Sequence, residues 1–540
     1  MIIIVFRTLL VMCVSTFSRR IRRLCQGVAP SLGVVLAIVC AHAALCLADD
    51  KGYVSYREHG AVGDGVTDDL DAIIRAHDAA NKANLPVRAD AGATYYIAAV
   101  KKTAKVQTDT DWGNAKFIID DSKVTIDDRN SHIFNVASRL PSTKITTVSA
   151  LKKNQEKLDL ALEHRAFIVV TDNNVKRYIR YGANRNNGTA QTDVFIVAKD
   201  GRVDKTAPII WDFDQISAMT AYPIDPETLT VKGGHFTTIA NQVESRYNYF
   251  ARGINITRSN VLIDGVHHAI TGELDYGAPY GGFISVSACT DVMVQNCMLS
   301  GHKTYSTIGA AGTSVSMGTY DISVNRANNV TFKNCKQLNS IHDGKLWGIF
   351  ASNFSKNLTL DTVEFSRFDA HMGVVNATIR NSVMGHVGIN LIGSGLFLIE
   401  NTKVCSGSFI NLRGDYGSTW EGEFIIRNCE FFPRNGAQSD AVLLNGSYSG
   451  QHDFGYVCYM PRKITIDGLV INDTNPPNNY KGPKIFSNFN GAFTSEAYVE
   501  KYPYVITEEV SIKNLTIKSG KPYIVSTNPF MFRNVKITEN

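Results

Sequence analysis

The sequence predicts an all-β protein folded as a parallel β-helix, a solenoid of stacked three-strand coils, with a helix capping its N-terminal end and a small inserted α+β or β module. Three observations predict this class. A pattern of a short strand, an Asn or Asp and a small residue recurs through the second half of the chain. The composition, with 42 Gly and 10% aromatic residues, favours strands and turns. Helical periodicity is nearly absent from residue 230 onward.

The first 48 residues have the composition of an export leader. Arg19 to Arg23 form a positive region, Leu32 to Leu47 form an apolar run, and Cys46-Leu47-Ala48 offers small residues at the expected positions before Asp49. We assign residues 1–48 to a signal peptide or leader and expect an exported protein that is periplasmic, at the cell surface or secreted. An uncleaved membrane anchor is the alternative. No later stretch approaches the roughly 20 apolar residues of a transmembrane helix, so no other membrane association is expected.

The net charge of the chain comes from this leader. The formal net charge is +5, and the leader contributes five arginines, which are Arg7, Arg19, Arg20, Arg22 and Arg23, and no acidic residue. Without them the 55 basic residues become 50, equal to the 50 acidic residues. A nearly neutral mature protein has no nucleic-acid footprint, so we expect no nucleic-acid partner. A basic groove on such a protein can still bind an anionic substrate.

Residues 49–130 are expected to form the N-terminal cap and the first coils. A helix is predicted to begin after Thr67 or Asp68, either of which can cap it. One face of this helix would carry Leu70, Ile73, Ile74 and His77. Such a helix can plug the open end of a solenoid, which otherwise exposes unpaired strand edges.

Residues 131–230 depart from the coil pattern and are predicted to form an inserted or early-coil β module. Ser149 to Arg165 is predicted as a helix. Four strands are predicted, at Ala166 to Val170, Tyr178 to Tyr181, Asp193 to Ala198 and Pro208 to Trp211. The module could bind glycan or merely pack on the solenoid.

Residues 231–540 are predicted to form the main β-helix, because the strand–Asn/Asp–small pattern repeats there. The closest markers, Asp361, Asn381 and Asn401, are 20 residues apart, which fits one coil, and longer spacings fit loops inserted at the turns. The pattern also explains three cysteines, Cys297, Cys335 and Cys429, which are expected to be buried free thiols. We expect them to share one inward column with Gly265, Thr362, Ser382 and Thr402.

The residues after the leader also carry a family resemblance. Residues 60–69 read GAVGDGVTDD and precede an Ala- and Ile-rich helix. This segment resembles the N-terminal motif of the pectate-lyase-like superfamily, which includes polysaccharide lyases, glycoside hydrolases and phage tailspikes. The resemblance implies a right-handed parallel β-helix that acts on or binds carbohydrate. The motif covers about 30 residues and is specific for fold and weak for reaction, whereas the repeat covers residues 255–515 independently.

The polar residues that follow the repeat markers are the candidate site. A parallel β-helix carries its ligand groove on an outer face, where coils are about 4.8 Å apart. If the strands at Met372, Asn390 and Asn411 align, then His371, Asn390 and Asn411 form one column. Arg413 would lie on the same face as Asn411. The 20-residue spacing leaves no room for large loops, so these side chains are expected to form an open floor.

The residue types on this floor favour a lyase that cleaves a uronic-acid glycan by β-elimination. This reaction needs a base next to the sugar carboxylate and positive charge to stabilise the enolate-like intermediate. His371 or His386 could be the base, with Tyr416 as an alternative acid or base. Arg413, with Lys345 or Arg367, could neutralise the carboxylate. A Ca²⁺ ion held by Asp343, Asp369 or Asp415 could do the same.

Two other functions remain open on the same scaffold. A glycoside hydrolase needs paired carboxylates, for which Asp369 and Asp415 are candidates. A non-catalytic glycan-binding surface protein, or a structural surface protein, needs neither. In each glycan-binding case the partner is a polysaccharide, and the candidate substrate-binding residues are His342, Lys345, Trp347, Asn390, Asn411 and Trp420. Basic and aromatic residues outnumber paired carboxylates on these coils, which favours the lyase.

Overall fold

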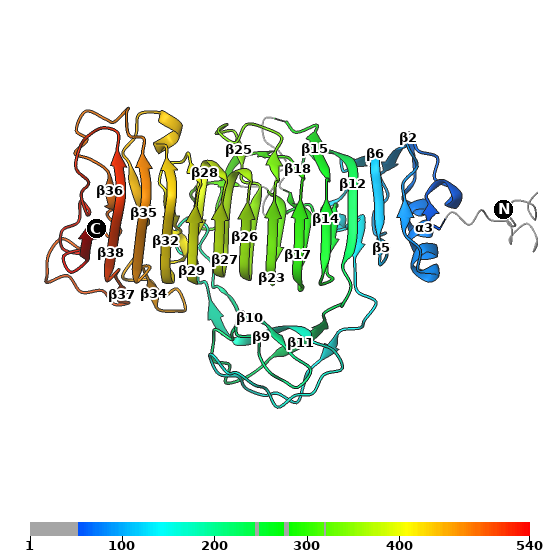
Figure 1. Cartoon of the computed structure of the whole chain (residues 1–540), viewed down its shortest axis with the longest axis horizontal. Helices are drawn as coiled ribbons and strands as arrows, with labels where there is room; N and C mark the ends of the chain where they lie inside the picture. Colours follow the sequence, from blue (N-terminus) through cyan, green and yellow to red (C-terminus); the bar gives the residue numbers. More distant parts are fainter. Residues whose placement is uncertain (1–51, 244–247, 275–279, 318–319, 540) are drawn as a thin grey trace, which may run out of the picture. The chain divides into compact units, whose positions relative to one another are not determined.

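The computed structural model describes residues 52–243, 248–274, 280–317 and 320–539. The proposed leader, residues 1–48, lies outside the described residues. Val54–Asn540 belong to one compact unit, and Figure 1 shows its strands stacked side by side along one axis. No helix in the described part of the chain has the length and apolar content that crossing a membrane requires.

The unit is a right-handed parallel β-helix with three strand faces, as the sequence predicted. Face A contains β14 (Val261–Asp264), β17 (Thr290–Gln295), β23 (Asn328–Lys333), the ends of β26 (Phe350–Asp361) and β27 (Glu364–Arg380), β29 (Gly393–Glu400), and the starts of β32 (Trp420–Phe431), β35 (Lys463–Ile471) and β38 (Glu509–Ile517), closed by β39 (Lys536–Glu539).

Face B contains β15 (His267–Thr271), β18 (Met298–Leu299), β24 (Lys336–Gln337), the starts of β27 and β28 (Val383–Leu391), β30 (Lys403–Val404) and the ends of β32, β35 and β38. Face C contains β7 (Phe134–Val136), β13 (Ile254–Ile256), β16 (Gly281–Ser287), β22 (Tyr320–Asn325), the start of β26, the middle of β27, the end of β28, β31 (Ile410–Leu412), β33 (Val442–Asn445) and β36 (Lys484–Phe486). The first coils use β1 (Val54–Ser55), β2 (Asp64–Asp68), β3 (Val87–Arg88), β4 (Thr94–Ile97), β5 (Ala104–Val106) and β6 (Thr110–Asp120), and β12 (Leu229–Ile239) stacks on β6.

Alternating side chains fill the space between the three faces. Phe350, Phe368 and Phe397 are fully buried and stack through successive coils, with ring centroids 5.2 and 6.2 Å apart. Each such ring excludes water from a coil interior, which is the main stabilising term of a solenoid.

The recurring asparagines mark the sharp turn from face A to face B. Asn296, Asn334, Asn381 and Asn401 have φ values of 47–55°, in the left-handed region that Asn tolerates better than most residues. Their side-chain amides also bond from coil to coil, as between Asn334 and Asn296 at 2.7 Å. The repeat therefore reflects one backbone requirement, met once in each coil.

The cysteine column contains Ser382 and Thr402, as the sequence suggested, but not Gly265 or Thr362. All six described cysteines are free and buried, which confirms the expectation of free thiols for Cys297, Cys335 and Cys429. Gly265 and Thr362, expected beside them, instead occupy the left-handed turn position, with φ of 71° and 57°. The apolar residues that follow these two are buried with the cysteines.

The predicted capping helix is α3 (Leu70–Ala83), which lies at the N-terminal end of the solenoid in Figure 1. Leu70, Ile73 and His77 are buried as expected, and His77 bonds the Tyr56 hydroxyl at 2.9 Å. Asp69, and not Thr67 or Asp68, occupies the N-cap position. Asp68 still accepts a hydrogen bond from the Leu70 amide at 3.1 Å.

A β module is inserted between β7 and β12 and lies beside the coils in Figure 1. Its antiparallel sheet contains β8 (Thr143–Lys144), β9 (Ala166–Arg177), β10 (Thr189–Val197) and β11 (Ala218–Pro223). The helix predicted at 149–165 is wrong, as are the strands at 178–181 and 208–211. Leu151 and Leu158 are instead buried on irregular chain that pairs with Phe213 and Gly201, so their apolar spacing serves packing on a sheet edge. The module is thus all β.

Short elements complete the loops. Single-turn 3₁₀ helices occur at Arg57–His59, Ile126–Asp128, Gly414–Tyr416 and Pro433–Gly436. Small strand pairs join β19 (His302–Lys303) to β25 (Leu346–Trp347), β20 (Tyr305–Ile308) to β21 (Ser314–Met317), and β34 (Cys458–Tyr459) to β37 (Tyr504–Val505).

Candidate functional site

The polar column on face C contains Asp369 where His371 was expected. Asp369 pairs with Asn390, which pairs with Asn411, which pairs with Asn445. The register shifts at His371, because Ala370 pairs with Ser352 while the next paired residue, Met372, already faces Asn353. His371 is therefore the extra residue of a β-bulge, which re-aims its side chain away from the column.

Five charged side chains form a connected cluster over this column, named here the arginine–aspartate cluster: Arg180, Arg367, Asp369, Arg413 and Asp415. Arg413 lies at its centre, with Nη1 2.8 Å from Asp369 and Nη2 2.8 Å from Asp415. Arg367 contacts Asp369 and Arg180 contacts Asp415, at 2.8 and 2.7 Å. Three guanidinium groups face two carboxylates, so the cluster carries one net positive charge.

Burial divides the cluster into a closed and an open part. The Asp369 side chain is fully buried, whereas those of Arg180 and Asp415 are 17% and 24% exposed. Burial opposes ionisation of both carboxyls, but Arg367 and Arg413 hold the pKa of Asp369 below its usual range. Arg413 and Arg180 do the same for the pKa of Asp415. Both aspartates are therefore ionised at neutral pH.

His371 lies beside this cluster as a neutral imidazole. Burial, reinforced by the charge of Arg413, lowers the pKa of His371 to about 3. Its Nδ1 is 3.3 Å from Oδ1 of Asn353, a contact that favours the tautomer with the ring proton on Nδ1, since an amide oxygen only accepts. Nε2 then carries the free lone pair. The His371 residue as a whole is partly exposed.

The expected open floor is covered by the inserted module. Tyr178 and Arg180 follow β9 and reach across to the solenoid, where Arg180 lies 5.3 Å over the Tyr416 ring. Tyr416 is only 2% exposed and packs with Tyr178 and Ile392. Burial raises the pKa of Tyr416 to about 12. Tyr416 is therefore a packing residue, and its expected role as an acid or base at the surface is wrong.

The remaining predicted site residues have separate surroundings. Trp420 is fully buried and donates to the Gly395 carbonyl at 2.9 Å, so it cannot stack on a sugar ring. Asn390 and Asn411 bond each other at 2.8 Å within a side-chain ladder, which engages part of their polar groups. Trp347 is partly exposed, with the Arg367 guanidinium 4.7 Å over its ring.

Two histidines and a lysine lie on the neighbouring 340–347 loop and the coil beneath it. His342 and Lys345 are exposed. His386 is partly exposed and its Nδ1 is 3.0 Å from the Ile341 carbonyl, which ties this ring to the loop. The structure therefore brings His371, Asp369, Arg413 and Asp415 together and leaves His386 bound to the loop.

The carboxylates considered for calcium do not form a calcium site. In the described residues, no group of three or more His, Cys, Asp or Glu side chains could share a metal ion. Asp343 is exposed on its loop, and Asp369 and Asp415 are already engaged by arginines. A hard cation needs several free oxygen ligands, so these residues do not fit Ca²⁺.

A cleft of about 950 Å³ lies between the module and the solenoid. Successive coil corners between faces C and A line one wall, with residues 354–357, 373–376, 392–395 and 419, 421 and 422. The module lines the other wall with residues that include Arg177, Trp211 and Asp212. Three steps between four coils span about 14 Å, so the cleft suits an extended ligand. Tyr178 and Gly373 border it on the side of the arginine–aspartate cluster.

One buried ion pair fastens the module to the solenoid at this cleft. Asp193 on β10 and Lys356 on β26 are 2.8 Å apart, with side chains 1% and 2% exposed. Asp193 also accepts the Ile210 amide at 2.7 Å, and Lys356 donates to the Pro208 carbonyl. Burial raises the pKa of Asp193 and lowers that of Lys356, and their mutual attraction opposes both shifts.

The cleft was not anticipated from the sequence, which suggested only that the module could bind glycan. One wall comes mainly from residues 153–212 and the other from coil corners between residues 354 and 422, and only the second wall belongs to the repeating coils. An Arg and a Trp inside a segment that breaks the repeat, Arg177 and Trp211, were the available signal.

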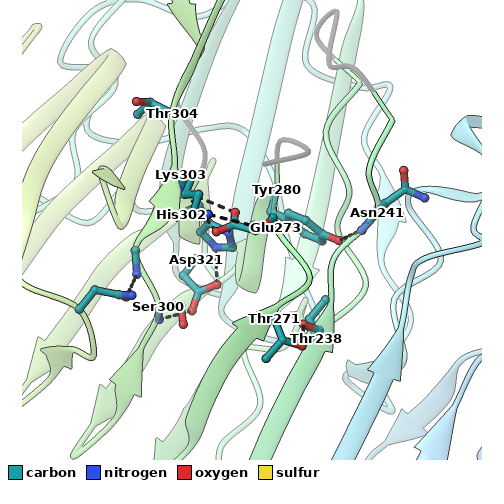
Figure 2. Close-up of polar contacts among 12 residues, drawn as sticks. Thr238, Asn241, Thr271, Glu273, Tyr280, Ser300, His302, Lys303, Thr304 and Asp321 are labelled. Carbon is teal, nitrogen blue, oxygen red and sulfur yellow. Dashed lines mark hydrogen bonds and ion pairs between the residues drawn. The ribbon is translucent and has the colours of Figure 1, made fainter. Parts of the chain in front are cut away.

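A second polar cluster, shown in Figure 2, is enclosed around β19 and β22. Asp321 lies 2.9 Å from His302 Nε2 (Figure 2). Asp321 also lies 2.7 Å from His268 Nδ1. Glu273 lies 3.6 Å from His302 Nδ1. Burial alone would lower the pKa of His302, but Asp321 and Glu273 raise it to about 9. His302 and Asp321 are fully buried, so their contacts join neighbouring coils.

Comparison with known proteins identifies the fold. No protein-family model and no curated protein matches the chain. The tailspike gp61 of Pseudomonas phage phi297 matches with a TM-score of 0.54 and 13% identity, covering 88% of this chain and 84% of the tailspike. The tailspike gp49 of Pseudomonas phage LKA1 matches with a TM-score of 0.48 and 13% identity, covering 90% of this chain and 84% of the tailspike. The Streptococcus pneumoniae surface adhesin PfbA matches with a TM-score of 0.38 and 13% identity, covering 90% of this chain and 92% of the adhesin. At this identity, the first likeness shows a shared fold and nothing about activity.

Proposed function

We propose that this protein is an exported enzyme that binds a polysaccharide along the module cleft and cleaves uronic-acid-containing glycan by β-elimination. The cleft is the observation that carries the proposal. It crosses four successive coils, and its volume of about 950 Å³ is large for a single small metabolite. An open cleft of this length suits several linked sugar units. The resemblance of residues 60–69 to carbohydrate-active proteins supports the same substrate class.

The ionised state of the Asp369 and Asp415 carboxylates favours elimination over hydrolysis. A glycoside hydrolase needs one protonated carboxyl as general acid and a second carboxylate within reach. Arginines hold both Asp369 and Asp415 ionised, and Asp369 is fully buried. Neither can donate a proton to a leaving sugar at neutral pH.

The elimination step uses His371, which lies beside the cluster and two residues before Gly373 of the cleft wall. The Nε2 lone pair of His371 takes the proton at C5, next to the sugar carboxylate. The electron pair of that C–H bond forms a C4–C5 double bond, the C4–O4 bond breaks, and the leaving oxygen takes a proton from solvent. The net positive charge of the arginine–aspartate cluster stabilises the charge that develops on the sugar carboxylate.

The experiment is incubation with a panel of uronic-acid polymers, followed by ultraviolet absorbance of the new double bond and by a reducing-end assay. Both signals are expected with one polymer. The variant H371Q should lose at least 100-fold in kcat. H235A is the matched control, because His235 is an exposed histidine on β12.

Each other outcome points to a different function. Reducing ends without absorbance would indicate a hydrolase. Retention of glycan without product would indicate a binding protein, and neither retention nor product would indicate a structural surface protein.

A further inference from the structure

One cation in the module cleft has no carboxylate partner. Four of the five basic residues that line the cleft are ion-paired with acidic residues of this chain: Lys153 with Glu421, Lys205 with Glu156, Lys356 with Asp193, and Arg462 with Glu508. Arg177 is the fifth, and among the described residues no carboxylate lies within 4 Å of its guanidinium. Asp453 acts on Arg177 only from farther away.

Neutral acceptors hold this guanidinium in place. Its Nε and Nη2 donate to the side-chain oxygen of Gln191 at 2.9 and 2.7 Å, and its Nη1 donates to the Gly455 carbonyl. Gln191 is itself buried and donates to the Asp212 carbonyl at 2.8 Å, so the acceptor is fixed as well. These bonds use three of the five N–H groups and leave one on each Nη.

An aromatic ring lies directly beside this charge. The Arg177 guanidinium carbon is 4.5 Å from the centroid of the Trp211 ring, and both residues line the cleft. Trp211 is partly exposed, which leaves part of its indole open to the cleft. An indole stacks on the C–H face of a sugar ring, and two N–H groups on adjacent nitrogens match the two oxygens of a carboxylate.

Among the described residues that line the cleft, no other charged group pairs with Arg177. Asp212 has no ion-pair partner among the described residues, but its carboxylate accepts the Lys153 amide at 2.8 Å and acts on the charge of Lys152. A half-buried cation without a counter-ion is costly to desolvate, and an anionic ligand relieves that cost.

We propose that Arg177 and Trp211 form a subsite that selects a sugar bearing a carboxylate, with the carboxylate on Arg177 and the sugar ring on Trp211. This inference rests on the proposed function, since it takes the module cleft as the glycan-binding site. It goes further by making charge recognition a property of the module, separate from the arginine–aspartate cluster.

The test compares each uronic-acid polymer with its own carboxyl-reduced form, which keeps the linkages and replaces each carboxylate by a neutral CH₂OH group. Affinity is measured by the retardation of the protein in gels containing either polymer. Wild-type protein should bind the native polymer at least tenfold more tightly than the reduced one. This comparison needs no variant, so it remains decisive even where a substitution prevents folding.

Single substitutions then show whether Arg177 is responsible for the preference for the native polymer. R177M keeps the aliphatic stem and should lose at least tenfold in affinity for the native polymer with little change for the reduced one. R177K keeps a charge without the paired N–H geometry, so its affinity for the native polymer should lie between those of wild type and R177M. R202M is the matched control, because Arg202 belongs to the module but does not line the cleft, is 73% exposed and pairs with Asp200 at 2.7 Å, and it should change affinity less than threefold.

The outcomes separate this inference from the proposed function. Equal binding of native and reduced polymers, or equal loss of both in R177M, would overturn the carboxylate subsite while leaving a glycan-binding cleft. Binding of dextran sulfate without binding of any uronic-acid polymer would also overturn the carboxylate assignment. Absence of binding to every polymer would overturn the proposed function as well.

Discussion

The ion pair between Asp193 and Lys356 provides the sharpest test of how the module is attached. At 2.8 Å and an effective dielectric constant of about 20, two unit charges attract by roughly 6 kcal/mol. Desolvation of both groups offsets most of this attraction, so the pair itself contributes little net stability. Removing one partner leaves the other charge buried alone, which costs about 3–5 kcal/mol. We therefore expect D193N and K356M each to loosen the module, and the double variant D193N/K356M to restore much of the loss.

Hydrogen exchange on β9 and β10 measures this loosening locally, which suits a solenoid that does not unfold as one unit. A loss of about 3–5 kcal/mol corresponds to roughly 150- to 4,000-fold faster exchange in either single variant. E156Q breaks the exposed pair between Lys205 and Glu156 and should change exchange less than about threefold. Unchanged exchange in both single variants, or a double variant equal to the sum of the singles, would refute the reasoning.

Three further predictions concern protonation and backbone geometry. Because the pKa of His371 is lowered to about 3, the acidic limb of kcat/KM should lie well below pH 6, and a limb near 6.5 would exclude His371 as the base. Because the pKa of His302 is raised from 6.5 to about 9, about 3 kcal/mol of stability should be present below pH 6.5 and lost as pH rises through 9. Thermal midpoints of wild type and H302Q between pH 6 and 10 check this, and equal slopes would contradict it. Gly373 and Gly92 both have positive φ, but only at Gly373 would a Cβ collide with the Tyr178 hydroxyl. G373A should therefore lower the thermal midpoint clearly more than G92A, whose cost is about 1–2 kcal/mol.

The fold was predictable because each coil repeats one local requirement. Asn381 and Asn401 occupy the same left-handed turn, and a single sequence shows that requirement many times. The register around His371 was not predictable, because the bulge at that position depends on how β27 stacks on β26. The alignment differs from the expected one by two residues, which places Asp369 in the column where His371 was expected.

The candidate site was only partly predictable for a related reason. Arg413 and Asp415 are two residues apart, so their pairing is a local property of one turn. Arg180 reaches Asp415 across 235 positions, and no periodic pattern reports such a contact. That contact gives the ionised Asp415 a second arginine partner and places Arg180 over the Tyr416 ring, and both features were missed with it.

The position of the module separates stability from function in this protein. Each coil of a solenoid is stabilised mainly by its immediate neighbours, so the coils that line the cleft do not need the module to fold. The module follows β7 in the sequence, yet it contacts later coils. Asp193 contacts β26, and Arg180 contacts the 3₁₀ turn after β31. A few such contacts determine the shape of the cleft, while the solenoid supplies a flat wall of coil corners. Substitutions at these contacts should therefore change glycan binding before they change the stability of the coils. If Arg177 and Trp211 select the ligand as proposed, substitutions in the module alone should change it, because the repeat that encodes the fold contributes neither residue.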